Sequence, residues 1–321
     1  MQTIEEIQKR IAETFKEIDF RKKPGELYEP ISYTLSLGGK RLRPALCLMA
    51  CDMFGGDVEQ AINPAIGIEI FHNFTLLHDD IMDEAPLRRG EETVYKKWNT
   101  NVAILSGDTM MALAYEYIMK APESIRSEVF SVFNKTAIEV CEGQQYDMNF
   151  ETQNNITIKD YIEMIRLKTA VLLAGSLKIG AMLAGADSEY CEALYRFGEN
   201  LGIAFQLKDD LLDVFSDIEK FGKQTGGDIA TNKKTFLYLK AFEKAEGETL
   251  TRLTHLFGNN DSDKISEVRK IYEELNIREE TENEMKKYFD RAMDFIEIIP
   301  VNENRKSELI KFAQLLNRRE S

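Results

Sequence analysis

Apolar residues recur every three to four positions along most of this chain, which is the spacing of helices with one buried face. The pattern runs through residues 64–85, 161–167, 188–215, 236–244, 265–275, 282–298 and 304–316. No segment alternates apolar and polar residues over the length that a half-buried strand needs. The pattern therefore predicts an all-α fold.

Local signals place several ends of these helices. Asn63 followed by Pro64 predicts an N-cap and a first helical residue, and Pro86 predicts the end of that helix. Thr157 and Asp160 have the spacing of a capping box, in which each side chain accepts a hydrogen bond from the other residue's backbone amide. A further helix is therefore expected to begin after Thr157.

Composition favours one large domain. Of the 321 residues, 43% are hydrophobic and only 7 are proline, and no stretch rich in proline, glycine or serine divides the chain. We therefore predict a single domain over residues 1–321. The first residues lack the order of a secretion signal and no apolar stretch is long enough to cross a bilayer, so we expect a cytoplasmic protein without a membrane span.

The overall charge limits the kinds of partner. The formal net charge is −14 at pH 7. Binding to a nucleic acid or to an anionic membrane requires a basic surface, so neither is an expected partner. A site for a phosphorylated ligand must therefore be built locally from a few cations.

Two copies of one acidic pattern, Asp-Asp-x-x-Asp, each lie in a long apolar stretch. On a helix the first and last aspartates of each copy lie one turn apart and point to the same side. Carboxylate oxygens suit Mg²⁺, which keeps coordination positions open for substrate phosphates. The candidate metal ligands are Asp79, Asp80, Asp83, Asp209, Asp210 and Asp213.

An aspartate pair on a helix is more often a solvated face than a metal site. Here the same pattern occurs twice, and apolar residues such as Phe74, Leu77, Phe205 and Leu211 border the two copies. Charges placed on such helices are costly unless a cation neutralises them. The duplication therefore favours a metal site in one cavity that both copies share.

Cations occur in compact groups near both acidic motifs. A glycine pair precedes the first group, Arg88 and Arg89 follow the first motif, and a glycine-rich loop follows the second. Glycines, cations and a following helix are typical of anion sites, and paired guanidinium groups bind phosphate. Solvated surface clusters are the alternative for each group taken singly. The candidates are Lys40, Arg43, Arg88, Arg89, Lys223 and Lys233, with His72 two turns before Asp79.

These motifs resemble those of the trans-isoprenyl diphosphate synthases, also called polyprenyl synthetases. The resemblance rests on both aspartate motifs, Gly-Gly-Lys-Arg-x-Arg-Pro at 38–44, Leu-Arg-Arg-Gly at 87–90, Lys168-Thr169, Phe205-Gln206 and Gly222-Lys223. It implies a bundle of about 10 to 15 helices around a deep central cavity, as a homodimer. It also implies Mg²⁺, about three ions per active site, and the joining of isopentenyl diphosphate to an allylic diphosphate.

The resemblance also implies a role for each matching residue. Asp79, Asp83 and Asp209 resemble the metal ligands, supported by Asp80, Asp210 and Asp213. The residues that resemble the isopentenyl diphosphate site are Lys40, Arg43, His72 and Arg89. Those that resemble the allylic diphosphate site are Arg88, Lys168, Lys223 and Lys233. Oxygens of Thr169 and Gln206 are expected to steady the allylic cation in a chamber that excludes water.

Bulky residues before the first motif are candidates for setting the product length. Phe74 lies five positions before Asp79, about 7.5 Å along a helix, and Phe71 lies eight before it, about 12 Å. The alternative is that both are ordinary core aromatics. In the family an aromatic residue at Phe74's position indicates a short product, and Thr75 beside it departs from the paired aromatics of animal-type farnesyl synthases. Products of C15 and C20 both stay open.

Two other functions stay open beside an elongating prenyltransferase. A class I terpene cyclase or a head-to-head prenyl synthase would also ionise an allylic diphosphate, but it does not need Lys40 and Arg43 for a second diphosphate. A non-catalytic subunit of a heterodimeric synthase would be expected to have lost aspartates from one motif. Both motifs are intact in this chain.

Overall fold

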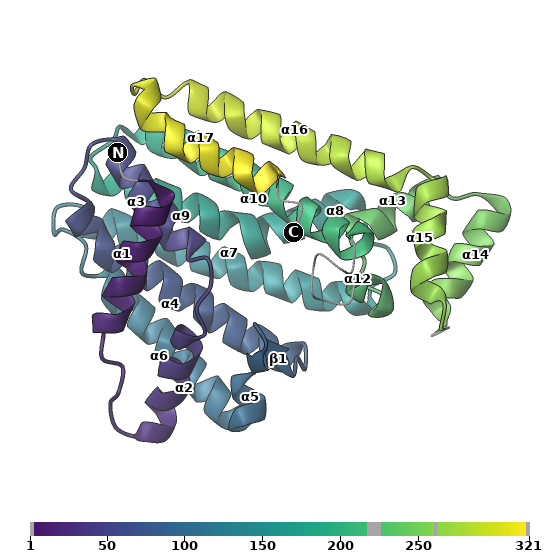
Figure 1. Ribbon diagram of the computed structural model, residues 1–321, viewed down its shortest axis with the longest axis horizontal. Helices are drawn as coiled ribbons and strands as arrows, with labels where there is room; N and C mark the ends of the chain where they lie inside the picture. Colours follow the sequence, from purple (N-terminus) through teal and green to yellow (C-terminus); the bar gives the residue numbers. More distant parts are fainter. Residues whose placement is uncertain (1–2, 217–225, 260–261, 319–321) are drawn as a thin grey trace. The chain divides into compact units, whose positions relative to one another are not determined.

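The computed structural model describes residues 3–216, 226–259 and 262–318. Gly222 and Lys223, which the sequence places in a phosphate-binding loop, lie outside these residues. The described chain is helical along nearly its whole length, as Figure 1 shows. The all-α prediction is therefore confirmed.

The elements of the first half of the chain are α1 (Ile4–Glu17), α2 (Gly25–Ser36), α3 (Leu42–Met53), α4 (Val58–Met82), β1 (Leu87–Arg88), β2 (Glu91–Glu92), α5 (Val94–Lys97), α6 (Thr100–Ile118) and α7 (Arg126–Thr152). Those of the second half are α8 (Ile158–Ile165), the π-helical segment η1 (Arg166–Ala170), α9 (Val171–Leu183), α10 (Ser188–Phe215), α12 (Gly227–Ala230), α13 (Phe236–Lys244), α14 (Gly247–Gly258), α15 (Lys264–Glu274), α16 (Ile277–Glu297) and α17 (Glu303–Arg318).

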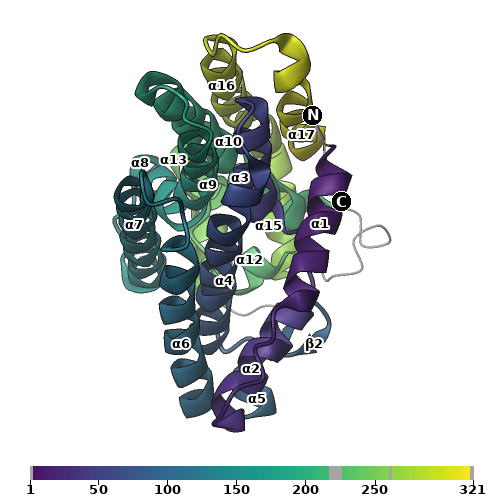
Figure 2. The same ribbon diagram turned by 90° about the vertical axis from the view of Figure 1, so that its left-hand side faces the viewer.

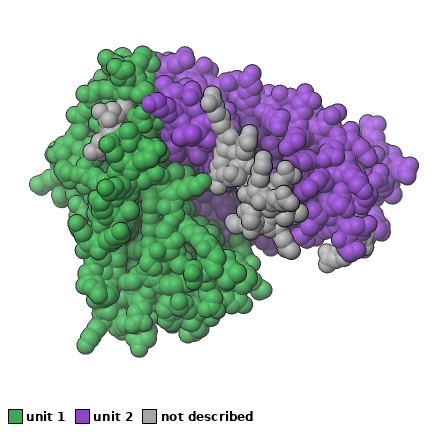
Figure 3. Space-filling view, in the orientation of Figure 1, with its two compact units in different colours: residues 1–137, 175–194, 300–309 green, residues 138–174, 195–299, 310–321 purple. Residues whose placement is uncertain are grey.

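The chain forms two compact units, coloured green and purple in Figure 3. Unit 1 comprises residues 1–137, 175–194 and 300–309, and unit 2 comprises residues 138–174, 195–299 and 310–321. Helices α7, α9, α10 and α17 contribute residues to both units. The single-domain assignment stays a prediction. Within the described part of the chain, every helix is too short or too polar to cross a bilayer.

Unit 1 is organised around α4, which lies along α6 in both Figure 1 and Figure 2. Gly67 of α4 permits this close approach, because a Cβ atom there would lie 2.9 Å from the carbonyl oxygen of Ala114 in α6. Ile66, Ile68 and Ile70 of α4 are buried in the core. The helix that ends with the first acidic motif is thus held along most of its length.

The predicted start of α4 was wrong. The helix begins at Val58, and the side chain of Asp57 caps it by accepting a hydrogen bond from the amide of Glu59. Pro64 lies inside the helix, where it removes a backbone hydrogen bond at a cost of about 3 kcal/mol. Burial of an isoleucine such as Ile66 contributes about 1.5–3 kcal/mol, so the buried residues around Pro64 offset this cost.

A short hairpin that the apolar pattern did not predict follows α4. Strands β1 and β2 pair antiparallel, with Arg88 opposite Glu91. The two turn residues, Arg89 and Gly90, both have positive φ angles, of 55° and 83°. This is the combination of the type I′ turn, whose twist matches that of a hairpin. The hairpin decides where the guanidinium groups of Arg88 and Arg89 point.

Unit 2 has a core of its own, to which α8 and α13 to α16 contribute. Tyr161 and Tyr272 are among its fully buried side chains. The capping box of Thr157 and Asp160 is confirmed, since both of its backbone-to-side-chain hydrogen bonds are present. The helix after it changes into the π-helical segment η1, which carries Lys168 and Thr169.

Candidate functional site

The first acidic motif lies at the C-terminal end of α4. Asp83 is one residue past the helix, and its amide still donates to the carbonyl oxygen of Asp79 at 2.8 Å. Asp83 is exposed, Asp79 is half-buried, and the middle residue Asp80 is only 4% exposed. The outer two carboxylates therefore lie one turn apart towards solvent, while the middle one points into unit 1.

Arg88 is the partner of the buried aspartate. Its Nε atom donates to Oδ1 of Asp80 at 2.8 Å, and its Nη2 atom lies 2.7 Å from the same oxygen. Burial raises the pKa of Asp80, and the hydrogen bond from Arg88 opposes that rise. The guanidinium group of the neighbouring Arg89 donates to the carbonyl oxygen of Gly38. The hairpin thus connects the first motif with the glycine-pair loop.

The loop that follows the glycine pair is held by a residue that the sequence did not single out. Arg41 is 8% exposed and forms a 2.6 Å ion pair with Glu69 of α4, which is 2% exposed. It also donates to the carbonyl oxygen of Leu35 at 2.5 Å, and its backbone is left-handed, with φ 47°. One signal for this pair was visible: Glu69 stands between Ile68 and Ile70 in an otherwise apolar run.

Arg43 and His72, both predicted for the isopentenyl diphosphate site, contact each other. Nη1 of Arg43 lies 3.0 Å from Nε2 of His72. An arginine can only donate, so Nε2 accepts and the ring proton resides on Nδ1. Burial lowers the pKa of His72 well below its usual value, and the charge of Arg43 lowers it further. His72 is therefore neutral at neutral pH, with Nδ1 as its donor. Burial also lowers the pKa of Arg43, to about 10, which leaves it charged.

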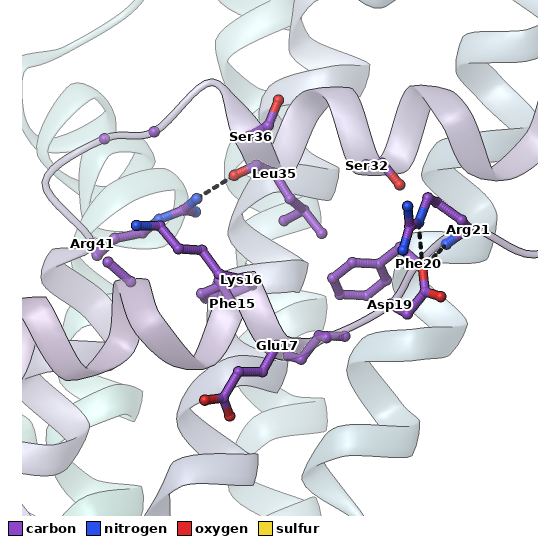
Figure 4. A pocket seen from close by; sticks show the side chains of 14 residues that line it. Phe15, Lys16, Glu17, Asp19, Phe20, Arg21, Ser32, Leu35, Ser36 and Arg41 are labelled. Carbon is purple, nitrogen blue, oxygen red and sulfur yellow. Dashed lines mark hydrogen bonds and ion pairs between the residues drawn. The ribbon is translucent and has the colours of Figure 1, made fainter.

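An open cavity of about 640 Å³ lies in unit 1 between α1, α2 and the loop of residues 38–41, as Figure 4 shows. Phe15, Phe20 and Leu35 form apolar parts of its wall. The guanidinium group of Arg41 lies 4.7 Å from the ring centre of Phe15, within the range of a cation–π contact. The predicted isopentenyl site residues do not line this cavity, so it is distinct from that predicted site.

The second acidic motif, on α10, repeats the arrangement of the first. Asp209 and Asp213 are half-buried, whereas the middle residue Asp210 is 4% exposed. Asp210 accepts hydrogen bonds from the hydroxyl of Tyr161 and, at 3.1 Å, from Nε2 of Gln206. Burial raises the pKa of Asp210 to about 6, and these two hydrogen bonds oppose the rise. In both motifs the middle aspartate is buried and hydrogen-bonded within its own unit, and the outer two are more exposed.

A seventh aspartate, which the sequence did not single out as a site residue, joins the second motif. The amide of Asp228 donates to Oδ2 of Asp213 at 3.0 Å, and the amide of Gly226 donates to the carbonyl oxygen of Asp213 at 2.7 Å. Burial and, to a lesser degree, the charge of Asp210 raise the pKa of Asp228 to about 7. The sequence signal for Asp228 was the pair of glycines before it. Gly226 has a φ of 87°, which glycine adopts more readily than other residues.

The predicted allylic-site lysines of unit 2 converge on Asp147 of α7. Nζ of Lys168 lies 2.5 Å from Oδ2 of Asp147, and Nζ of Lys233 lies 4.0 Å from the same oxygen. Burial alone would raise the pKa of Asp147, but the charges of Lys233 and Lys168 outweigh this effect and lower the pKa below its usual value. The neighbouring Lys234 has a different role, because its ammonium group donates to the carbonyl oxygen of Phe150 near the end of α7.

Thr169 and Gln206, predicted to steady the allylic cation, also meet within unit 2. The hydroxyl of Thr169 donates to Oε1 of Gln206 at 3.1 Å. Gln206 donates in turn to Asp210, so the π-helical segment and the second acidic motif are connected through one side chain. Both residues are half-buried.

The aromatic residues proposed to set product length differ in exposure. Phe71 is fully buried and packs edge-on against Phe133, with ring centres 5.4 Å apart. Phe74 is half-buried and contacts Phe71 and His78, at 5.6 and 4.8 Å between ring centres. The hydroxyl of Thr75 donates to the carbonyl oxygen of His72 at 2.8 Å. Phe74 is therefore the more accessible of the two aromatic candidates.

The predicted residues are thus assembled in two groups. Unit 1 holds the first motif with the residues predicted for isopentenyl diphosphate, and unit 2 holds the second motif with Lys168, Lys233, Thr169 and Gln206. Lys223 lies outside the described residues. Over the described ranges, no three aspartate, glutamate, histidine or cysteine side chains are close enough together to hold a metal by themselves. The metal site and the shared cavity stay predictions.

Comparison with known proteins identifies the family. The family model described as polyprenyl synthetase matches residues 24–275. A geranylgeranyl diphosphate synthase of Methanosarcina mazei is 44% identical over 224 residues, which cover 69% of this chain and 69% of that protein. A geranylfarnesyl diphosphate synthase of Natronomonas pharaonis is 40% identical over 237 residues, covering 68% of this chain and 70% of that protein.

The fold agrees with this relationship. A crystal structure of a geranylgeranyl pyrophosphate synthase matches 100% of this chain with 100% of its own, at a TM-score of 0.94 and 42% identity. The family model covers most of the chain, and the acidic motifs lie within the matched residues. The chain therefore belongs to the polyprenyl synthetase family, and it is a prenyltransferase.

Proposed function

We propose that this chain condenses isopentenyl diphosphate with an allylic diphosphate, head to tail, to give geranylgeranyl diphosphate (C20) and free diphosphate. The observation that carries the proposal is the matched arrangement of the two acidic motifs, each with a buried middle aspartate and more exposed outer ones. The names of relatives such as the Methanosarcina mazei enzyme support the C20 product.

Mg²⁺ is the metal that fits the donors. The outer aspartates, Asp79, Asp83, Asp209 and Asp213, offer only carboxylate oxygens, which a hard cation prefers. Mg²⁺ needs few protein ligands because water and substrate phosphates complete its coordination, so a preformed group of three side chains is not required. The bound ions would stabilise the charge that develops on the leaving diphosphate. About three ions per active site would match the family. Asp80 and Asp210 would orient the two motifs through their hydrogen bonds with Arg88 and Tyr161.

Two groups of cations would bind the two substrates. Lys168 and Lys233 would contact the allylic diphosphate, together with Arg88 and with Lys223. In unit 1, the guanidinium group of Arg43 and the Nδ1 proton of His72 would bind isopentenyl diphosphate, with Lys40 and Arg89. This second cationic group favours an elongating enzyme over a terpene cyclase, which has no second diphosphate to hold.

The oxygens of Thr169 and Gln206 would face the allylic cation. They are weak nucleophiles held to each other by a hydrogen bond, so they would stabilise positive charge without reacting with it. The allylic carbon–oxygen bond breaks, the isopentenyl double bond forms the new carbon–carbon bond, and a proton leaves to the departing diphosphate. No side chain of the protein has to form a covalent bond.

The test is a product assay with purified protein, Mg²⁺, isopentenyl diphosphate and one of dimethylallyl, geranyl or farnesyl diphosphate. All three primers are expected to yield C20 as the final product, measured by chromatography after dephosphorylation. C15 as the end product, which the sequence left open, would correct the length. Cyclic or head-to-head products, or no product with any primer, would contradict the proposed function.

Replacing Phe74 with alanine is expected to lengthen the product by at least one isoprene unit. The half-buried ring would no longer block the growing tail, whereas Phe71 behind it is already in the core. Product length is measured as above, with Leu76→Ala as the control because its side chain leaves α4 on the opposite side from Phe74. An unchanged product from Phe74→Ala would show that the tail does not run past this residue.

We also propose a homodimer. Ile104 and Leu105 of α6 are adjacent large apolar residues that are 41% and 57% exposed, which suits burial against a second copy. Sedimentation is expected to give twice the 36.9 kDa mass of the chain, and Leu105→Lys is expected to give the monomer mass. A wild-type monomer would refute the dimer. The cytoplasmic location stays a prediction from the sequence.

A further inference from the structure

The backbone of Lys168 lies against a glycine of α7. A Cβ atom on Gly143 would lie 2.2 Å from the amide nitrogen of Lys168 and 2.7 Å from the carbonyl carbon of Leu167. Contacts below 3.0 Å to backbone atoms require one of the two segments to move. Only glycine therefore allows α7 and the π-helical segment η1 to lie at this distance.

One turn further along α7, Asp147 contacts the other end of the same lysine. Its carboxylate pairs with the ammonium group of Lys168 at 2.5 Å, and the side chains of Lys168 and Asp147 are 22% and 16% exposed. Residues four apart on a helix lie on one face. The same face of α7 thus contacts the backbone of Lys168 through Gly143 and its ammonium group through Asp147.

Helix α10 contacts η1 in the same way. A Cβ atom on Gly202 would lie 2.6 Å from Cα of Ala170, and Gln206, four residues later, accepts the hydrogen bond of Thr169. Each helix supplies a glycine for close backbone contact and, one turn later, a polar side chain. The backbone of the π-helical segment is therefore in close contact with both helices at positions where a side chain would not fit.

We propose that Gly143 and Asp147 are positioning residues for Lys168, and that they determine where its ammonium group meets the allylic diphosphate. Gly143 determines how closely the backbone of Lys168 approaches α7. The ion pair with Asp147 holds the side chain of Lys168 in one orientation before substrate binds. This inference rests on the proposed function for its kinetic consequence. Its structural part, the placement of the ammonium group by two residues of α7, does not.

Kinetics of Gly143→Ala and Asp147→Asn test the proposal. A shift of about 1 Å in a group that acts on the reacting diphosphate costs about 10²-fold in rate. Gly143→Ala is expected to lower kcat 10- to 100-fold and to raise KM for the allylic diphosphate, with KM for isopentenyl diphosphate unchanged within about two-fold. Asp147→Asn is expected to shift the two KM values in the same way, and Asp147→Glu is expected to recover part of the loss.

The matched control is Gly56→Ala. A Cβ atom on Gly56 would lie 2.6 Å from Cα of Ala184, a similar backbone clash in unit 1 that involves no candidate site residue. This variant is expected to lose thermal stability to a similar degree as Gly143→Ala without any change in the ratio of the two KM values. The same KM pattern in Gly56→Ala would show that general destabilisation explains the result and would overturn the proposal.

A chemical readout separates the proposal from the function. With limiting acetic anhydride, the acetylation of Lys168 relative to the exposed Lys286 is measured by mass spectrometry. Both Gly143→Ala and Asp147→Asn are expected to raise this ratio several-fold, because the ammonium group is then no longer held by the carboxylate of Asp147 and is more accessible to the reagent. An unchanged ratio would overturn the proposal even in an active enzyme. An inactive wild-type protein would refute the proposed function but leave this comparison valid.

Discussion

Replacing Asp209 with asparagine is expected to lower kcat about 10²- to 10³-fold, with little change in folding stability. The asparagine keeps the shape of the side chain and removes the charge that would bind Mg²⁺. Asp209 is half-buried and more exposed than Asp210, so its side chain is expected to contribute less to the core. Asp79→Asn in the first motif is expected to behave in the same way, and steady-state kinetics with both substrates measures the effect.

Two further variants make this result specific. Asp290→Asn removes an exposed aspartate of α16 and is expected to leave kcat unchanged. Asp210→Asn replaces one of the two oxygens that accept from Tyr161 and Gln206 with an amide group that can only donate, so it is expected to lower the thermal midpoint, unlike Asp209→Asn. If Asp209→Asn retained wild-type turnover at saturating Mg²⁺, the second motif would not be part of a metal site.

Replacing Arg41 with methionine is expected to destabilise the protein by about 3–5 kcal/mol, because it leaves the buried carboxylate of Glu69 without its ion-pair partner. Among the described residues, Oε2 of Glu69 has no hydrogen-bond partner, and Oε1 accepts from Arg41 and, at 3.1 Å, from Nδ2 of Asn73, so the ion pair with Arg41 is a large part of what compensates the charge. Denaturation by urea, followed by far-UV circular dichroism, measures the loss as a lower midpoint.

The double variant Arg41→Met with Glu69→Met distinguishes this explanation from a loss of packing. When both charges are removed, the desolvation penalty disappears with the ion pair, so most of the stability is expected to return. Arg21→Met provides an exposed comparison, because Arg21 pairs with Asp19 at the surface and the midpoint is expected to change little. A double variant less stable than Arg41→Met would contradict the account.

The helices were largely predictable because their signals are local. The predicted helix 236–244 agrees with α13, and 188–215 agrees with α10, residue for residue. The start of α4 was not predictable in this way, because Pro64 at a first helical position and Pro64 inside a helix give the same local sequence. Packing of the residues around Pro64 against the rest of unit 1 decides between the two.

The candidate site could be predicted in its residue types but not in its pairings. The sequence identified Asp80 and Asp210 as members of acidic motifs, yet it assigned them no partner. Their partners are Arg88, eight residues away, and Tyr161, 49 residues away. Asp147 was missed for the same reason, because a single acid on a polar helix has no local feature that marks it as the partner of Lys168.

The sequence by itself determined the helical class, the two acidic motifs and the cationic groups beside them, since each depends on residue type and on spacing within a few turns. Only the tertiary structure decided that the middle aspartates point inward, that Arg41 pairs with Glu69, and that Gly143 allows close contact with Lys168. Helical periodicity is a property of neighbouring residues, whereas the partner of a buried charge is set by whichever side chain the packing brings to it.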